Sequence, residues 1–111
     1  MNEEQYKRYR KMMSEPIKCL HRKKDSKNNL YFLINNSSDK NYKIKISQNG
    51  KIECSCPDFT KGGAKIEKCI CKHCLFVIFK ILKIFKDINH TFFKRCFFTP
   101  DEIKNINKII N

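Results

Sequence analysis

The sequence predicts a small α+β fold, in which an antiparallel β-meander leads into a helix that a metal ion anchors, with further helices at both ends. Three observations support this prediction. Residues Tyr42–Ile46 alternate apolar and polar side chains, and Gln48-Asn-Gly50 follows with the signal of a tight hairpin turn. Apolar residues at helical spacing then indicate a helix from about Cys71 to Lys86. Between hairpin and helix lie two short pairs of residues that bind metals in other proteins.

The chain before this hairpin predicts one helix and two strands. Asn2–Ser14 reads as a polar helix, since acidic residues stand near its start, basic residues follow, and Pro16 ends it. Ile17–His21 fits a short strand. Leu30–Ile34 is a stronger strand prediction because it is rich in aromatic and branched residues.

Lys51–Cys54 is the predicted return strand of the hairpin, and it ends at the first metal-ligating pair. Pro57–Lys68 then reads as a basic loop whose flexible point is Gly62-Gly63. The last predicted helix opens at Thr99-Pro-Asp-Glu, which offers a capping hydroxyl, a proline at the first position and acids in the first turn.

The helix from Cys71 to Lys86 should bury one apolar face. Phe76 falls on the opposite face, between Lys72 and Lys80, so it is either covered by the C-terminal segment or an exposed contact. The residues expected to be buried are Cys74, Leu75, Ile78, Ile81, Leu82 and Phe85.

The two metal-ligating pairs are Cys54-x-Cys56 and, fourteen residues later, Cys71-x-His73. Three thiolates and one imidazole form the ligand set of a closed, structural zinc site. Each pair is a local chelate, so one ion has only to join the strand end to the helix start. Cys69 and Cys74 flank the second pair, and spacing alone leaves either of them able to replace Cys71 as the third ligand.

These residues carry a resemblance to a known family. Lys51–Phe59 (K-I-E-C-S-C-P-D-F), the basic loop and Cys71-Lys-His73 resemble a SWIM-type zinc finger, whose pattern is C-x-C, a variable spacer and C-x-H in a strand–strand–helix unit. The match is strong from about Tyr42 to Phe85. A weaker likeness at Arg8–Ser14 and Thr99–Ile103 is to SWIM units of ubiquitin-ligase-like proteins, in which a RING finger commonly follows. No RING pattern occurs in these 111 residues.

The resemblance implies one structural Zn²⁺ held by Cys54, Cys56, Cys71 and His73. It also implies a zinc-finger core at residues 42–86, within a single domain that spans residues 1–111.

Composition narrows the class of protein. Seven cysteines without a secretory signal favour metal binding and free thiols in a reducing compartment, so we expect an intracellular protein of the cytoplasm or nucleus. The longest apolar run, Cys74–Phe79, is too short to span a membrane, and we expect no membrane partner. The net charge of +13 favours polyanions by long-range attraction.

The expected function is binding without catalysis. By residue type Asp58 could act as a general base, but the sequence shows no nucleophile pair and no substrate-binding loop to accompany it. We therefore predict that the chain is not an enzyme. By analogy with SWIM units beside RING fingers, the first hypothesis is a protein-interaction module, an adaptor in ubiquitin-related processes. The alternative is a nucleic-acid (DNA) binding module, with Phe59 and Phe76 as stacking partners. Its candidate phosphate contacts are Lys61, Lys65, Lys72, Lys80 and Lys83, together with Lys43 and Lys45 on the solvent-exposed face of the strand Tyr42–Ile46.

Overall fold

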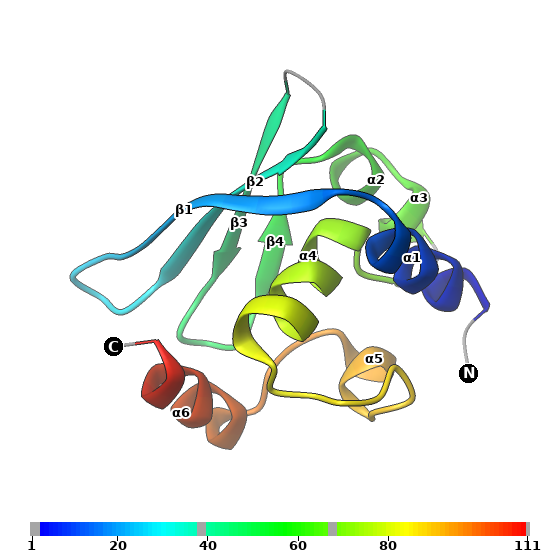
Figure 1. Ribbon diagram of the computed structural model, residues 1–111. Coiled ribbons are helices and arrows are strands. Elements are labelled where there is room, and N and C mark those ends of the chain that lie inside the picture. The colour runs from blue at the N-terminus through cyan, green and yellow to red at the C-terminus, as the bar shows by residue number, and fades with distance from the viewer. Residues whose placement is uncertain (1–2, 38–39, 67–68, 111) are drawn as a thin grey trace.

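A computed structural model of the chain describes residues 3–37, 40–66 and 69–110, with the side chains of 65 and 66 outside the description. The fold is built on a four-stranded sheet in the order β1-β2-β3-β4, in which each strand pairs antiparallel with the next (Figure 1). This confirms the α+β class and the predicted meander. The strands are β1 (Ile17–Lys24), β2 (Leu30–Asn36), β3 (Asn41–Ile46) and β4 (Ile52–Cys54).

The helices gather against one face of this sheet and at its end. α4 lies in front of β3 and β4 in Figure 1, and α1 packs beside α4. Their bounds are α1 (Glu3–Ser14), α2 (Pro57–Thr60), α3 (Gly63–Ile66), α4 (Lys72–Phe76), the π-helical η1 (Val77–Leu82), α5 (Phe92–Arg95) and α6 (Pro100–Ile109). No helix in the described part of the chain has the length and apolar character needed to cross a bilayer.

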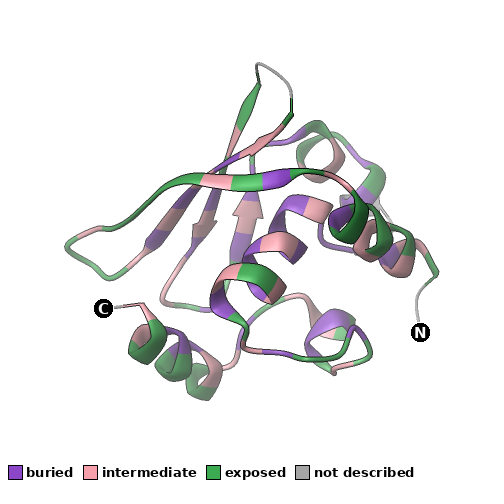
Figure 2. Ribbon diagram, in the orientation of Figure 1, coloured by how far each residue is buried: buried purple, intermediate pink, exposed green. Residues whose placement is uncertain are grey.

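The core lies between the sheet and these helices. In β2 and β3 the alternate residues Phe32, Ile34, Ile44 and Ile46 are buried, because successive side chains of a strand point to opposite faces. Figure 2 shows the contrast with the β1–β2 hairpin, whose far end is exposed. The hairpin therefore extends beyond the area that the helices cover.

Gly50 fixes the turn between β3 and β4. Its φ of +96° lies in the left-handed region that favours glycine, and Ser47 N–H closes the turn on the Lys51 carbonyl at 2.9 Å. The Phe98 N–H donates to the Gly50 carbonyl at 2.8 Å, and a side chain at residue 50 would collide with the Phe98 carbonyl. The turn thus holds the segment that leads into α6.

The predicted helix from Cys71 to Lys86 is shorter than expected. α4 passes directly into η1, which ends at Lys83 with a left-handed φ of 53°. The wider π turns rotate the helix face, so Val77 is fully buried whereas Ile81, which we expected in the core, is only half-buried. Phe76 is half-buried and packs against the core, so its ring is not a fully exposed contact.

The structure corrects the predicted loop at Pro57–Lys68 and confirms the predicted cap at Thr99. The loop predicted over Pro57–Lys68 contains the one-turn helices α2 and α3, so that prediction was incomplete. The capping of the last helix is confirmed: Thr99 Oγ1 accepts from the Glu102 N–H at 3.2 Å, and the Glu102 carboxylate accepts from the Thr99 N–H at 2.9 Å.

Candidate metal centre

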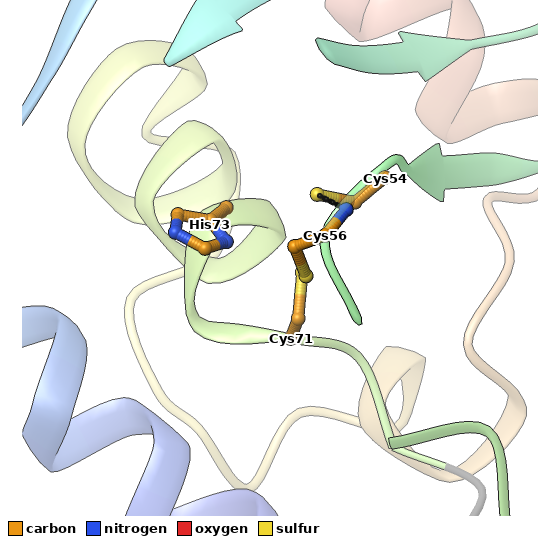
Figure 3. A group of neighbouring side chains, drawn as sticks. All are labelled: Cys54, Cys56, Cys71 and His73. Carbon is orange, nitrogen blue, oxygen red and sulfur yellow. Dashed lines mark hydrogen bonds between the residues drawn. The ribbon is translucent and has the colours of Figure 1, made fainter. Parts of the chain in front are cut away.

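The four predicted ligands come together from two places in the fold. Cys54 is the last residue of β4, and Cys56 stands immediately before α2. Cys71 is the N-cap residue of α4, and His73 lies in the first turn of that helix. Figure 3 shows the four side chains converging at the junction of the strand end and the helix start. We call this group the metal centre.

The geometry of the metal centre suits a single ion. One donor atom from each residue, a sulfur or an imidazole nitrogen, lies within 4.8 Å of every other. In a tetrahedral zinc site with bonds of 2.0–2.3 Å, ligand atoms stand roughly 3.5–3.8 Å apart. Small rotations of the four side chains would therefore bring their donor atoms to bonding distance from one ion.

His73 gives the clearest sign that a ligand belongs here. The residue is 4 % exposed, yet neither Nδ1 nor Nε2 has a hydrogen-bond partner. Buried polar atoms without partners are rare in folded proteins, since each costs free energy. A metal bound to one nitrogen would remove part of that cost. The ring of Tyr42 packs against His73 in a tilted arrangement, at a centroid distance of 4.7 Å and an interplanar angle of 37°, and helps to keep water from the imidazole.

The sulfurs are crowded and shielded from solvent. The pKa of Cys54 is raised, chiefly by its hydrogen bond with Cys56 and also by burial. For Cys56, the hydrogen bond with Cys54 lowers the pKa, but Cys71 and burial outweigh it and raise the value to about 11. The thiols of Cys54 and Cys56 therefore hold their protons at neutral pH unless a metal ion displaces them.

Cys74 lies beside the metal centre without belonging to it. Its side chain is fully buried, its Sγ is 3.6 Å from Cys71 Sγ, and burial raises its pKa. Cys69 is buried as well but is not a member of the four-residue group. The structure therefore favours Cys71 over both neighbours as the third ligand. Cys74 takes the core position that the sequence predicted for it.

Helix α1 braces the ligand loops, a feature that sequence reasoning missed. The carboxamide of Gln5, which is 2 % exposed, accepts from the Ile70 N–H and donates to the Ile70 carbonyl, both at 2.9 Å. These two bonds fix the backbone immediately before Cys71. Only the three-dimensional packing of α1 on α4 brings residues so distant in sequence together.

Two ion pairs also connect α1, or the residue after it, to the segments that carry the metal ligands. Arg8 donates to both carboxylate oxygens of Asp58 at 2.8 and 2.9 Å, and Asp58 also accepts from the Ala64 N–H. At the end of α1, Glu15 pairs with Lys72 at 2.6 Å. The segments next to Cys56 and Cys71 are thus both tied to α1. Asp58 thereby joins the segment after Cys56 to α1 and to the start of α3.

The lysines predicted for nucleic-acid contact lie in different settings. Lys61, Lys80 and Lys83 are exposed, whereas the ammonium of Lys72 is engaged by Glu15. The side chain of Lys65 lies outside the described residues. Phe59 and Phe76 are half-buried against the core, so neither presents a free ring for stacking.

Comparison with family models, with curated proteins and with solved structures gave no match. What can be said about function therefore rests on the metal centre and on the surfaces around it.

Proposed function

We propose that this chain is a zinc-stabilised, SWIM-type binding module that has no catalytic activity of its own. One observation carries the proposal: the buried imidazole of His73 has no hydrogen-bond partner and lies among three buried cysteine sulfurs. The C-x-C and C-x-H spacing and the position of the ligands at a strand end and a helix start agree with the SWIM pattern.

The donor set supports zinc in a structural role. Cysteine sulfur with one imidazole nitrogen suits Zn²⁺ better than Mg²⁺ or Ca²⁺, which take oxygen ligands. Four protein donors complete a tetrahedron, so no position is left for a substrate. Zinc would instead fasten the β3–β4 hairpin to α4, and binding of the metal would be coupled to folding.

The partner is the second part of the proposal. The resemblance suggests a protein partner, with the chain acting as an adaptor in ubiquitin-related processes. Among the described residues, however, the exposed large apolar side chains are scattered over four separate segments, as Met13, Leu20, Phe97 and Ile109. Four half-exposed side chains are few for the large contiguous apolar patch that usually marks a protein-binding site. The net charge of +13, with Lys43 and Lys45 on the side of β3 away from the buried Ile44 and Ile46, instead supports the nucleic-acid alternative.

Metal removal tests the proposal. The purified protein should contain one zinc, and a strong chelator should abolish its cooperative thermal unfolding, with recovery when Zn²⁺ is restored. His73→Ala should weaken zinc retention, whereas His21→Ala, on the exposed part of β1, should leave zinc content unchanged. A protein that unfolds at the same temperature with and without metal would contradict the structural role. Affinity capture with and without nuclease would separate the two partner classes.

A further inference from the structure

The sheet has a second face, turned away from α4, on which basic side chains surround one aromatic ring. Because Ile44 and Ile46 are buried under the helices, their neighbours Lys43 and Lys45 point to the opposite side. The antiparallel register sets the residues of this side in two rows across β1, β2 and β3. The rows are Lys23–Tyr31–Lys45 and His21–Leu33–Lys43, and we call these six residues the outer sheet face.

Tyr31 lies at the middle of the first row, between two ammonium groups. The Nζ atoms of Lys23 and Lys45 stand 5.8 and 5.9 Å from the centre of its ring. The Tyr31 hydroxyl donates to the Asp25 carboxylate at 3.0 Å, which fixes the direction of the ring. An oriented aromatic ring is thus presented between two cations on flexible stems.

The surface here is hollowed. A depression of about 520 Å³ lies over the β1–β2 hairpin and the adjoining part of β3. Five residues of the outer sheet face line it: His21, Lys23, Tyr31, Leu33 and Lys43, of which Leu33 is apolar. A hollow of this kind can receive a flat, partly apolar group, while the lysines at its border can meet negative charge.

Among the described residues, the carboxylates of Asp25 and Glu53 lie near the outer sheet face, and Asp25 also lines the hollow. Asp25 accepts hydrogen bonds from the Lys27 N–H, from the N–H and side chain of Asn29, and from Tyr31. Glu53, opposite Lys45 in the register, pairs with Lys51 at 3.5 Å. Asp25 keeps its negative charge, because its donors are neutral, but Lys23, Lys43 and Lys45 outnumber it, so the face has a net positive charge.

We propose that the outer sheet face binds single-stranded nucleic acid, with an unpaired base stacked on Tyr31 and phosphates held by Lys23, Lys43 and Lys45. Base stacking on an exposed ring, combined with a basic groove, is the general means of binding single strands without sequence preference. A duplex hides its base faces, so it would leave Tyr31 unused. An acidic protein would use the lysines but gain little from the ring. The contacts are to base and phosphate, so DNA and RNA should bind alike.

The inference deepens the proposed function by naming its partner, and its test uses the zinc-loaded full chain. Fluorescence anisotropy would follow binding of labelled twelve-nucleotide strands, oligo(dT) and oligo(U), from 50 to 300 mM salt. Each phosphate contact on a single strand contributes a slope of about −0.7 to the plot of log affinity against log salt. The double variant Lys43→Gln/Lys45→Gln should therefore bind more weakly and lose about 1.4 from the slope.

Two further sets of variants make the test specific. Tyr31→Leu should weaken binding about fivefold or more, since stacking on an aromatic ring is lost, whereas Tyr31→Phe keeps the ring and should bind nearly as the wild type. The double variant Lys104→Gln/Lys108→Gln changes the charge equally on exposed positions of α6 and should keep the wild-type slope. Zinc content and the unfolding temperature, measured on every sample, separate a damaged metal centre from a damaged binding face.

Several results would overturn the inference. One is the absence of oligonucleotide binding at 50 mM salt by protein that holds its zinc. Another is an equal loss of affinity in Lys104→Gln/Lys108→Gln and in Lys43→Gln/Lys45→Gln, which would show that only the overall positive charge attracts the oligonucleotide. A loss confined to Lys80→Gln/Lys83→Gln would place the contact at the end of η1. If duplex DNA bound more tightly than the single strands, the partner would be a duplex. If an acidic polyglutamate peptide bound more tightly and Tyr31→Leu did not weaken that binding, the partner would be an acidic protein.

Discussion

Replacing Gln5 with leucine tests whether α1 holds the ligand loop through two specific hydrogen bonds. Leucine fills a similar volume but cannot pair with the backbone, so the N–H and carbonyl of Ile70 would both remain buried without partners. Each unsatisfied group costs about 1–3 kcal/mol, so we expect the free energy of unfolding to fall by about 2–6 kcal/mol. For a chain of this length, that corresponds to a fall of about 8–24 °C in Tm.

The assay is thermal unfolding followed by circular dichroism, together with the rate of zinc transfer to a coloured chelator. Gln5→Leu should speed that transfer, because the loop before Cys71 loses its fixed position. Gln48→Leu is the matched control. Its carboxamide also makes two reciprocal bonds, to Asn107, and it donates to the Asn28 carbonyl as well. These bonds lie in exposed or part-buried settings where water can replace them, so we expect a loss below about 1 kcal/mol. Equal effects of the two variants on Tm, or an unchanged transfer rate in Gln5→Leu, would refute the reasoning.

Three further predictions address the ligand set, the hairpin turn and the last helix. Cys74→Ala should retain one zinc per chain and lose about 1 kcal/mol of stability, since only a packing group is removed; loss of the metal would make Cys74 a ligand. Gly50→Ala should cost at least about 2 kcal/mol, because the φ of +96° is strained for alanine and the new Cβ would collide with the Phe98 carbonyl oxygen. An unchanged Tm would show that the turn is not fixed in this way. Thr99→Ala should cost about 1 kcal/mol through the lost cap and leave zinc content unaltered; a simultaneous fall in zinc would show an unexpected link between α6 and the metal centre.

Local patterns carried most of what the sequence could predict. The alternation in Tyr42–Ile46, the Asn-Gly turn and the cap at Thr99 are each decided by neighbouring residues, and the structure has each of them. The metal centre is a similar case, because each chelating pair is local and only the joining of the two pairs depends on the fold. The single-domain prediction for residues 1–111, with a core at 42–86, stays a prediction.

What the sequence could not predict depends on contacts between distant segments. The Gln5–Ile70 bonds and the Arg8–Asp58 pair join residues more than 45 positions apart in the sequence. No periodic pattern of apolar or polar residues predicts such contacts. The π-helical turns of η1 were missed because apolar spacing in Val77–Leu82 also fits an ordinary helix. The extent of β1 was underestimated, since its polar end is ordered by pairing with β2 rather than by burial.

The most direct test of the central claim is the mass of the intact protein under native and denaturing conditions. We predict that the native protein carries one zinc ion, that the ion is absent after denaturation, and that Cys56→Ser carries less than one zinc and unfolds at a lower temperature. A folded native protein without metal, or a Cys56→Ser variant with full zinc and unchanged stability, would contradict the assignment of the metal centre.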